Sequence, residues 1–257
     1  MNRRHIAFSC EGSTLIGTLD EAEGSTGLLL TSGGNELRAG AWNGQAMLAA
    51  RIAAQGFPVF RFDRRGVGDS DGPNGEFRTS APDIAAALAA FRKAAPHVTR
   101  FVGLGNCDAA SALMLARGKG LDALILSNPW TIETPDDAPP PEAIRSHYRQ
   151  RLADPAALLR LLRGKVSFGK LLASLRGAMR PTSPPGSLAR DMAAAIADFD
   201  GPITFLIAER DRTGQAFLSA WRKNDGRVHT CPAATHSFVE AEARKWLTEK
   251  VLAALRD

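Results

Sequence analysis

Residues 101–112 read FVGLGNCDAASA, and this stretch decides the fold class. An apolar run typical of a buried strand enters a turn of the form Gly-x-Cys-x-small, and an alanine-rich segment typical of a helix leaves it. Gly105 lies two residues before Cys107 and Ala109 lies two residues after it. Small neighbours are needed where a strand-to-helix turn is sharp and its central residue is strained. The stretch therefore predicts an α/β sheet with Cys107 at the tip of a tight turn.

The predicted position of Cys107 suits a nucleophile. A residue at a helix N-terminus faces free N–H groups and the positive end of the helix dipole, which favour a thiolate and help to hold an oxyanion. We interpret the turn as a nucleophile elbow in which cysteine replaces the usual serine. The alternative is a small buried cysteine packed under a strand-to-helix turn, which is a common structural role.

Length and composition indicate a single domain of ordinary globular character. The chain has 257 residues, of which 44% are hydrophobic, and its net charge of +5 does not by itself imply nucleic-acid binding. The N-terminal sequence lacks the apolar segment of a signal peptide, and no apolar run reaches the roughly 20 residues of a membrane span. We therefore expect a cytoplasmic protein with no transmembrane segment and no nucleic-acid partner.

The cysteines show no sign of a disulfide framework or a metal site. Cys10, Cys107 and Cys231 are odd in number and far apart in sequence, which fits a reducing compartment. Residues 103–105, GLG, lack the later glycine of the dinucleotide-binding pattern G-x-G-x-x-G, because Asp108 stands at that position. We expect neither a metal nor a cofactor.

Short apolar runs alternate with segments of helical spacing along most of the chain. This alternation predicts a mostly parallel sheet of eight strands with helices on both faces, the first two strands forming a hairpin. The predicted strands are residues 5–9, 14–19, 27–31, 57–63, 101–106, 121–127, 203–208 and 227–230, and the clearest helices are 41–55, 82–94, 213–223 and 237–255.

Residues 131–187 interrupt the alternation. The segment begins and ends in proline-rich sequence, which indicates an insertion between two strands. We predict a core of residues 1–130 and 188–257 with a helical cap of residues 131–187. From Glu142 to Arg190, ten Lys and Arg stand against two acidic residues, so the net charge of that stretch is +8. These basic residues either meet an anionic substrate or form a solvated helical face.

Two further residues complete a catalytic pattern with Cys107. Asp211 follows the strand predicted over 203–208, and His236 follows the strand predicted over 227–230. The carboxyl ends of parallel strands meet at one edge of a sheet, so we expect the three side chains to lie together. The alternatives are structural roles, in which His236 caps the last helix and Asp211 caps the helix predicted over 213–223. The two roles of Asp211 do not exclude each other.

The elbow and the order Cys107, Asp211, His236 resemble the α/β-hydrolase superfamily over nearly the whole chain. Residues 63–70, DRRGVGDS, look like that superfamily's D-x-R-G-x-G-x-S loop, which is usually structural. The resemblance implies the α/β-hydrolase fold, with an insertion that lies over the site as a cap.

The loop after the third strand supplies further points of resemblance. Residues 32–35, SGGN, stand where the superfamily often has His-Gly, which implies that a backbone N–H of Gly34 or Asn35 joins that of Asp108 as the oxyanion hole. This loop, the cysteine elbow and the proline-flanked basic insertion look most like the hydrolase 1 group associated with the exosortase A system. That group is found beside bacterial genes for exopolysaccharide and protein sorting.

Two residues depart from the usual superfamily pattern. Cys107 in place of serine is similar to the dienelactone hydrolases, although chain length and the remaining signatures do not match those enzymes closely. Asp108 places a carboxylate directly after the nucleophile. That like charge would oppose thiolate formation if the side chain points inward, and it would matter little if the side chain points to solvent.

These features predict a hydrolase that cleaves an ester or a thioester through an acyl-cysteine. Cys107 attacks the carbonyl, and His236 takes the Cys107 proton or holds it as an ion pair. Asp211 fixes the tautomer of the imidazole and supports its charge. The alternatives are an acyltransferase that uses the same intermediate, a non-catalytic α/β-hydrolase-like binding protein, and a protein that docks on an anionic membrane or polysaccharide through the cap.

The expected substrate is a small-molecule or carrier-linked acyl group with anionic character. Trp130 follows the sixth predicted strand, and Arg145 and Arg149 lie early in the basic insertion. We expect the two arginines to meet the anionic substrate, and Trp130 to belong either to the wall of the substrate pocket or to the core.

Overall fold

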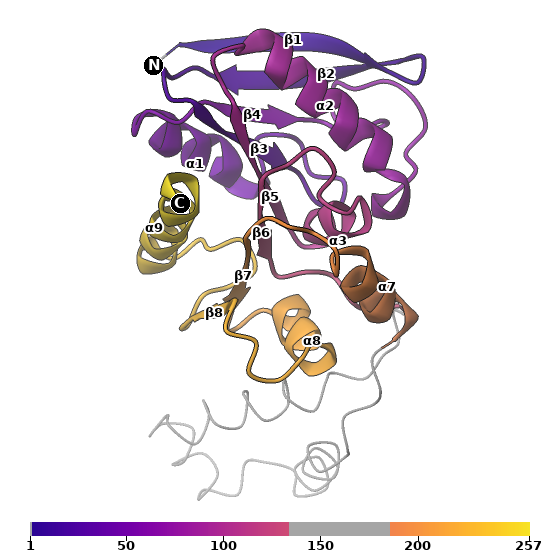
Figure 1. Ribbon diagram of the computed structural model, residues 1–257, viewed down its shortest axis with the longest axis vertical. Helices are drawn as coiled ribbons and strands as arrows, with labels where there is room; N and C mark the ends of the chain where they lie inside the picture. Colours follow the sequence, from indigo (N-terminus) through magenta and orange to yellow (C-terminus); the bar gives the residue numbers. More distant parts are fainter. Residues whose placement is uncertain (1, 134–185) are drawn as a thin grey trace, which may run out of the picture.

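The computed structural model describes residues 2–133 and 186–257, and within them eight strands form one sheet (Figure 1). The strand order is β1-β2-β4-β3-β5-β6-β7-β8. The pairs β1–β2 and β2–β4 are antiparallel and all others are parallel, so the predicted fold is confirmed. The strands are β1 Arg3–Cys10, β2 Ser13–Asp20, β3 Thr26–Thr31, β4 Val59–Phe62, β5 Arg100–Asn106, β6 Ala123–Ser127, β7 Ile203–Ala208 and β8 Val228–Cys231.

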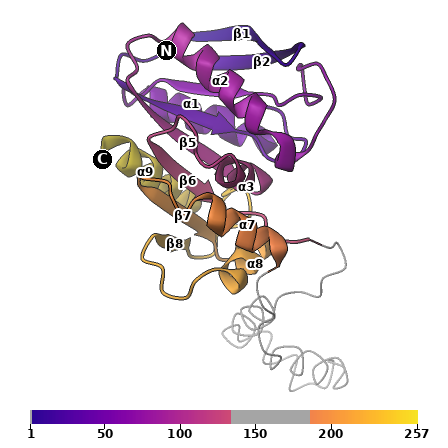
Figure 2. The ribbon, with the colours of Figure 1, turned by 45° about the vertical axis from the view of Figure 1, so that its right-hand side comes forward.

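Helices cover both faces of this sheet (Figures 1 and 2). Helices α1 and α9 pack on one face and α2, α3, α7 and α8 on the other, which buries an apolar cluster on each side. Strands such as β6 are buried along their whole length, as expected for parallel strands covered on both faces. The helical elements are η1 Ala41–Asn43, α1 Gly44–Ala53, η2 Phe77–Thr79, α2 Ala81–Ala94, α3 Asp108–Leu115, α7 Ser187–Ala195, α8 Arg212–Ala220 and α9 Ala241–Arg256.

Two helices begin later than their hydrophobic spacing predicts. The helix predicted from residue 41 starts with η1, because Trp42 and Asn43 have φ of 48° and 61° and cannot continue an α-helix. The last helix begins at Ala241 and not at residue 237, because Phe238 also has a positive φ. Apolar periodicity continues through both breaks, so the pattern alone overestimates the helix length.

The loop of residues 63–70 is held by buried bonds, which fits the structural role that its motif implies. The Asp63 side chain is fully buried and forms an ion pair with Arg38. Gly68 has a φ of +60°, and a Cβ there would come within 2.5 Å of the Asp63 carboxylate. The Ser70 hydroxyl donates to the Asp63 carbonyl at 2.8 Å. Arg64 is the exception, since it reaches toward the elbow.

The two ends of the predicted cap meet at the carboxyl edge of the sheet. The Glu133 carboxylate accepts hydrogen bonds from the backbone N–H groups of Ser187, at 3.1 Å, and Leu188, at 2.8 Å. The division into a core and a cap stays a prediction, because residues 134–185 lie outside the described part of the chain. Within residues 2–133 and 186–257, no helix is long and apolar enough to cross a membrane.

Candidate active site

Cys107 occupies a strained position between β5 and α3. Its backbone has φ 61° and ψ −129°, a region that a residue with a Cβ rarely adopts. A Cβ on Gly105 would lie 2.6 Å from the carbonyl carbon of Ala109, so only glycine allows the helix to leave the strand at this angle. A Cβ on Gly33, in the loop after β3, would lie 2.6 Å from the Asn106 carbonyl oxygen. The elbow geometry predicted from the sequence is present.

Asp211 and His236 lie together beside Cys107. Asp211 follows β7 and His236 follows β8, and their Oδ2 and Nδ1 atoms are 3.0 Å apart. The His236 ring also hydrogen-bonds the Cys107 side chain. The bond to Asp211 and, after it, the bond to Cys107 raise the pKa of His236 to about 10 from an ordinary 6.5, against the opposing effect of burial. The surroundings of His236, a carboxylate on one side and a sulfur on the other, therefore favour the protonated imidazole.

The alternative helix-capping roles of Asp211 and His236 have different outcomes. Asp211 does cap α8, since its Oδ2 atom accepts a hydrogen bond from the Gly214 N–H at 2.9 Å, and it does so while it also binds His236. A capping role for His236 is wrong, because α9 begins only at Ala241 and its N-cap residue is Glu240.

A pair of asparagines beneath the three residues was not foreseen. Asn106 ends β5, and its amide nitrogen lies 3.5 Å from His236 Nε2 and 3.4 Å from the His236 carbonyl oxygen. Asn128, fully buried after β6, donates to the Asn106 side chain at 3.1 Å and to the His236 carbonyl at 3.2 Å. It also accepts from the Ala208 N–H at 2.8 Å. The signal in the sequence was an asparagine at the end of each of two buried runs.

The Asp108 carboxylate points inward, toward the loop after β3. Its Oδ1 atom accepts a hydrogen bond of 2.6 Å from the Gly34 N–H, and its Oδ2 atom lies 3.5 Å from Arg64 Nη2. Arg64 is buried and also binds the Gly34 carbonyl and the Ser80 hydroxyl. The Gly34 N–H that the resemblance assigns to an oxyanion is thus occupied by a carboxylate. Arg64 places a cation against the like charge that Asp108 brings to the elbow.

The other predicted site residues have different positions. Asn35 is exposed, and its side-chain oxygen accepts a 2.7 Å hydrogen bond from Asn74. The backbone of Trp130 adjoins the elbow, since its N–H donates to the Cys107 carbonyl at 3.3 Å, while its ring packs against the buried cluster under α2 and α3. Arg145 and Arg149 lie outside the described residues. In the described ranges, no group of three His, Cys, Asp or Glu side chains could hold a metal ion.

Cys107 differs from the other two cysteines in its accessibility. Cys10 and Cys231 are 5% and 3% exposed, whereas Cys107 is half-buried. Burial and a hydrogen bond to Asp83 raise the pKa of Cys10 to about 11. Burial also raises the pKa of Cys231. Both are inert thiols of the packed interior.

Alkylation of the native protein should therefore select Cys107. We expect iodoacetamide at pH 8 to modify Cys107 at least about tenfold faster than Cys10 or Cys231, because only Cys107 is accessible and lies against a cation. Peptide mapping at increasing reaction times measures the three rates, and a denatured sample is the control. Equal labelling of the three cysteines in the native protein would contradict this assignment.

The raised pKa of His236 predicts a pH dependence of stability. A group whose pKa is higher in the folded state stabilises the fold fully below its unfolded value, here 6.5, and loses this contribution as the pH rises through about 10. The difference in unfolding free energy between wild type and His236→Ala should therefore shrink between pH 6.5 and pH 10.

Urea denaturation of both proteins across this pH range tests the expectation. Because part of the His236 ring is exposed, solvent screens its charge and reduces the size of the effect. The test therefore concerns the direction in which the difference in unfolding free energy changes with pH. Cys107→Ala should keep most of the dependence, because the bond to Asp211 is the larger cause. A difference that stays constant with pH would show that His236 is not a cation in the folded protein.

Comparison with known proteins bears on the family and the fold of this chain. The profile of the alpha/beta hydrolase family matches residues 28–249, whereas none of the curated proteins compared matches the sequence. Among solved structures, an esterase from Pyrococcus furiosus has a TM-score of 0.64 at 13% identity, covering 99% of this chain and 90% of its own. The alpha/beta hydrolase GrgF from a Penicillium species has a TM-score of 0.65 at 17% identity, covering 100% and 98%.

An alpha-beta serine hydrolase homologue from Coxiella burnetii has a similar fold, with a TM-score of 0.60 at 15% identity over 98% of this chain and 97% of its own. At such identities, the likeness to solved structures concerns the fold alone. The family match spans most of the sequence, including the elbow and the two loops with Asp211 and His236. The chain therefore belongs to the alpha/beta hydrolase family.

Proposed function

We propose that this protein hydrolyses an ester or a thioester through an acyl-cysteine formed on Cys107. The observation that carries the proposal is the position of the His236 ring, which bonds Asp211 on one side and the Cys107 side chain on the other. A nucleophile, a proton carrier and a residue that orients the carrier are the parts that covalent acyl transfer needs. The Pyrococcus furiosus structure is of an esterase, which is consistent with this bond class.

The charge state of His236 suggests how the reaction begins. In this scheme the Cys107 proton passes to His236, and Asp211 supports the imidazolium that forms. The sulfur attacks the carbonyl carbon, the C=O electrons move to oxygen, and the intermediate collapses as the imidazolium protonates the leaving group. The now neutral His236 takes a proton from water, whose hydroxide attacks the thioester, and the Cys107 thiolate leaves as the acid is released. The ion pair is then restored.

The oxyanion hole is the part of this scheme that the Asp108 carboxylate affects. The Asp108 N–H is the first of α3 and has no acceptor within the helix, so it is suited to an oxyanion. The second donor, Gly34 N–H, is bonded to the Asp108 side chain. We infer that the Asp108 carboxylate turns away from the Gly34 N–H, toward Arg64, when the oxyanion forms.

Two finer assignments also belong to the proposal. The SGGN loop, the cysteine elbow and the basic insertion resemble the hydrolase 1 group of the exosortase A system, which supports a substrate from exopolysaccharide-linked metabolism. A carrier-linked or anionic acyl group, bound in the cytoplasm, fits the same resemblance. An alcohol or amine in place of water would make the enzyme an acyltransferase with the same acyl-cysteine.

A non-catalytic binding protein is the second candidate, and one observation favours it. A carboxylate on the Gly34 N–H repels the negative charge that an oxyanion would bring to that position. The intact bond between His236 and Asp211 favours catalysis instead, since a binding protein has no need of an oriented imidazolium.

Acylation of Cys107 tests the proposal directly. Brief mixing with p-nitrophenyl butyrate should give a burst of nitrophenol and an acyl adduct on Cys107 in the intact-mass spectrum. Cys107→Ala should abolish both, and His236→Ala should slow adduct formation by about 10²-fold or more, as expected for loss of a proton carrier. Cys231→Ala is the matched control and should behave as wild type. No adduct, or an adduct that forms equally in His236→Ala, would favour the binding protein.

Removal of the Asp108 side chain tests the oxyanion hole. Asp108→Ala frees the Gly34 N–H, so we expect acylation to become several-fold faster, since one oxyanion donor contributes roughly 10²–10³-fold where it is fully used. Asp108→Asn keeps a side-chain oxygen on the Gly34 N–H but removes its charge, and should give an intermediate rate. Stopped-flow nitrophenol release measures the three rates, and a slower Asp108→Ala would mean that the carboxylate supports the reaction.

A further inference from the structure

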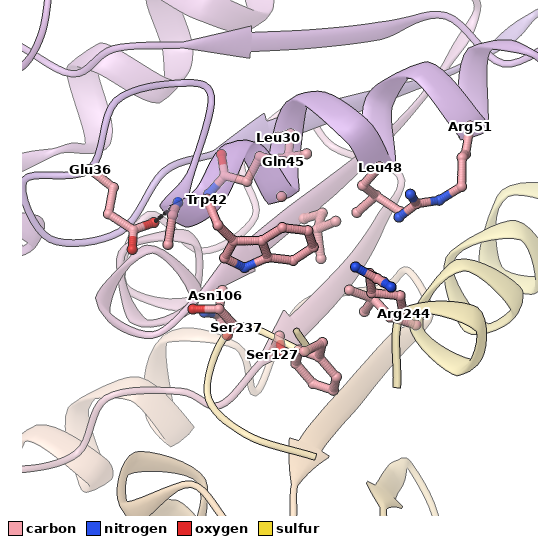
Figure 3. A pocket seen from close by; sticks show the side chains of 15 residues that line it. Leu30, Glu36, Trp42, Gln45, Leu48, Arg51, Asn106, Ser127, Ser237 and Arg244 are labelled. Carbon is pink, nitrogen blue, oxygen red and sulfur yellow. Dashed lines mark hydrogen bonds between the residues drawn. The ribbon is translucent and has the colours of Figure 1, made fainter. Parts of the chain in front are cut away.

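A pocket lies beside the elbow, between α1 and α9, at the carboxyl ends of β3, β5 and β6 (Figure 3). Its volume is about 70 Å³. A single water needs roughly 10–15 Å³ on the same scale, so the pocket can hold a small organic group. Asn106 and Ser237 line it, and they directly precede Cys107 and follow His236 in the chain. The pocket therefore adjoins the proposed catalytic residues.

The inner end of the pocket is polar because the strand residues that face it change from apolar to polar there. Leu104 and Asn106 lie on one face of β5, since side chains alternate along a strand, and Asn106 pairs with Ser127 of β6. Ser127 is 2% exposed, and its hydroxyl has no hydrogen-bond partner within the described ranges of the chain. A buried hydroxyl without a partner is rare, and here it belongs to a residue that lines the pocket.

The outer end of the pocket carries two arginines that have no carboxylate partner within residues 2–133 and 186–257. Arg51 from α1 and Arg244 from α9 point toward each other across the pocket (Figure 3). In the part of the chain that the structure describes, Arg51 donates to the Thr248 hydroxyl at 3.3 Å, Arg244 stacks over the Trp42 ring at 5.5 Å, and neither forms a salt bridge. Burial and the neighbouring Arg244 cation lower the pKa of Arg51. Two facing guanidinium groups make a site for an anion.

Among the described residues that line the pocket, Glu36 alone is acidic, and it does not neutralise this pair. Glu36 lies on the far side of the Trp42 ring, where its carboxylate accepts a long 3.4 Å hydrogen bond from the Ala41 N–H (Figure 3). Trp42 itself is held in a left-handed conformation, and a Cβ on Gly44 would come within 2.9 Å of its ring. Such strain is typical of residues kept for a binding role.

Between the two polar ends, the pocket wall is apolar. Leu30 and Leu104 form its floor, and Leu48 and Leu247 line it from α1 and α9. A ligand that fits has an anion at one end, a short apolar chain, and a polar group at the other end beside Asn106, which directly precedes Cys107 in the chain. A neutral aliphatic chain would leave both arginines unpaired.

We propose that this pocket binds the acyl chain of the substrate and that Arg51 and Arg244 hold a carboxylate at the far end of that chain. The preferred substrate is then a half-ester or half-thioester of a dicarboxylic acid. This inference rests on the proposed hydrolase function and names its substrate class. The planar guanidinium fork matches a carboxylate, and the small pocket favours it over the bulkier phosphate.

Binding to the inactive protein tests the pocket without any chemistry. Calorimetric titration of Cys107→Ala with hexanoate and with hexanamide compares an anion and a neutral molecule of the same length. We expect hexanoate to bind about ten- to hundredfold more tightly, as hydrogen bonds to charged groups predict. This preference should disappear when Arg51→Met or Arg244→Met is added. Arg256→Met, at the exposed end of α9, is the matched control and should keep it.

Kinetics with active protein tests the link to the reaction. Wild type should have a kcat/KM about ten- to hundredfold higher for the p-nitrophenyl half-ester of adipate than for p-nitrophenyl hexanoate, and Arg51→Met and Arg244→Met should lose this preference. Arg256→Met should keep it, together with hexanoate hydrolysis. Arg51→Lys and Arg244→Lys, which keep the charge, serve as second variants if a methionine variant fails to fold.

The outcomes separate the two proposals. Hydrolysis of both esters with no preference for the half-ester would overturn the carboxylate pocket and leave the hydrolase intact. Arginine-dependent binding of hexanoate without hydrolysis of either ester would overturn the hydrolase and support the carboxylate site. Tighter binding of hexyl phosphate than of hexanoate would overturn the assignment of the anion to a carboxylate.

Discussion

The strained backbone of Cys107 is the constraint on which the rest of the site depends. Holding a residue with a Cβ at a positive φ costs about 1–3 kcal/mol, and such a conformation persists only where the surroundings leave no alternative. Here, the Cys107 N–H donates to the Ser127 carbonyl at 2.9 Å, and its carbonyl accepts from the N–H groups of Ala110, at 3.1 Å, and Trp130, at 3.3 Å. Gly105 lets α3 pass close to β5. The elbow is thus imposed by its neighbours on both sides.

The polar layer beneath the elbow explains how three separate loops reach one point. Asn128 bonds to groups from β5, from β7 and from the loop that carries His236. Because the Asn128 side chain is fully buried, a shift of any one of these segments would leave one of its polar groups without a partner, which is costly in the interior. Asp211 adds a second link, since the same oxygen caps α8 and holds His236. The hydrogen bonds of Asn128 and Asp211, which join separate elements of the fold, therefore hold the His236 loop and ring in place.

Charge is distributed unevenly around this layer. Next to the elbow, the negative Asp108 is matched by the buried Arg64, so the turn carries its own counterion. In the neighbouring pocket, Arg51 and Arg244 face each other with no acidic partner among the described residues. The first arrangement is complete without a ligand, whereas the second is completed by an anion. This difference makes the pocket between α1 and α9 a site for substrate recognition and the Arg64 pair a part of the scaffold.

The sequence by itself determined the succession of strands and helices along the chain, the elbow, and the positions of Asp211 and His236 after their strands, because these follow from local periodicity, small residues at a turn, and the rule that parallel strands end at one edge. Only the tertiary structure decided that α1 and α9 begin late, that the Asp108 carboxylate occupies the Gly34 N–H, and that Arg51 and Arg244 meet. A left-handed residue such as Trp42 leaves the apolar spacing unchanged. Contacts between residues far apart in the chain depend on how helices pack across the sheet, and no local pattern records that packing.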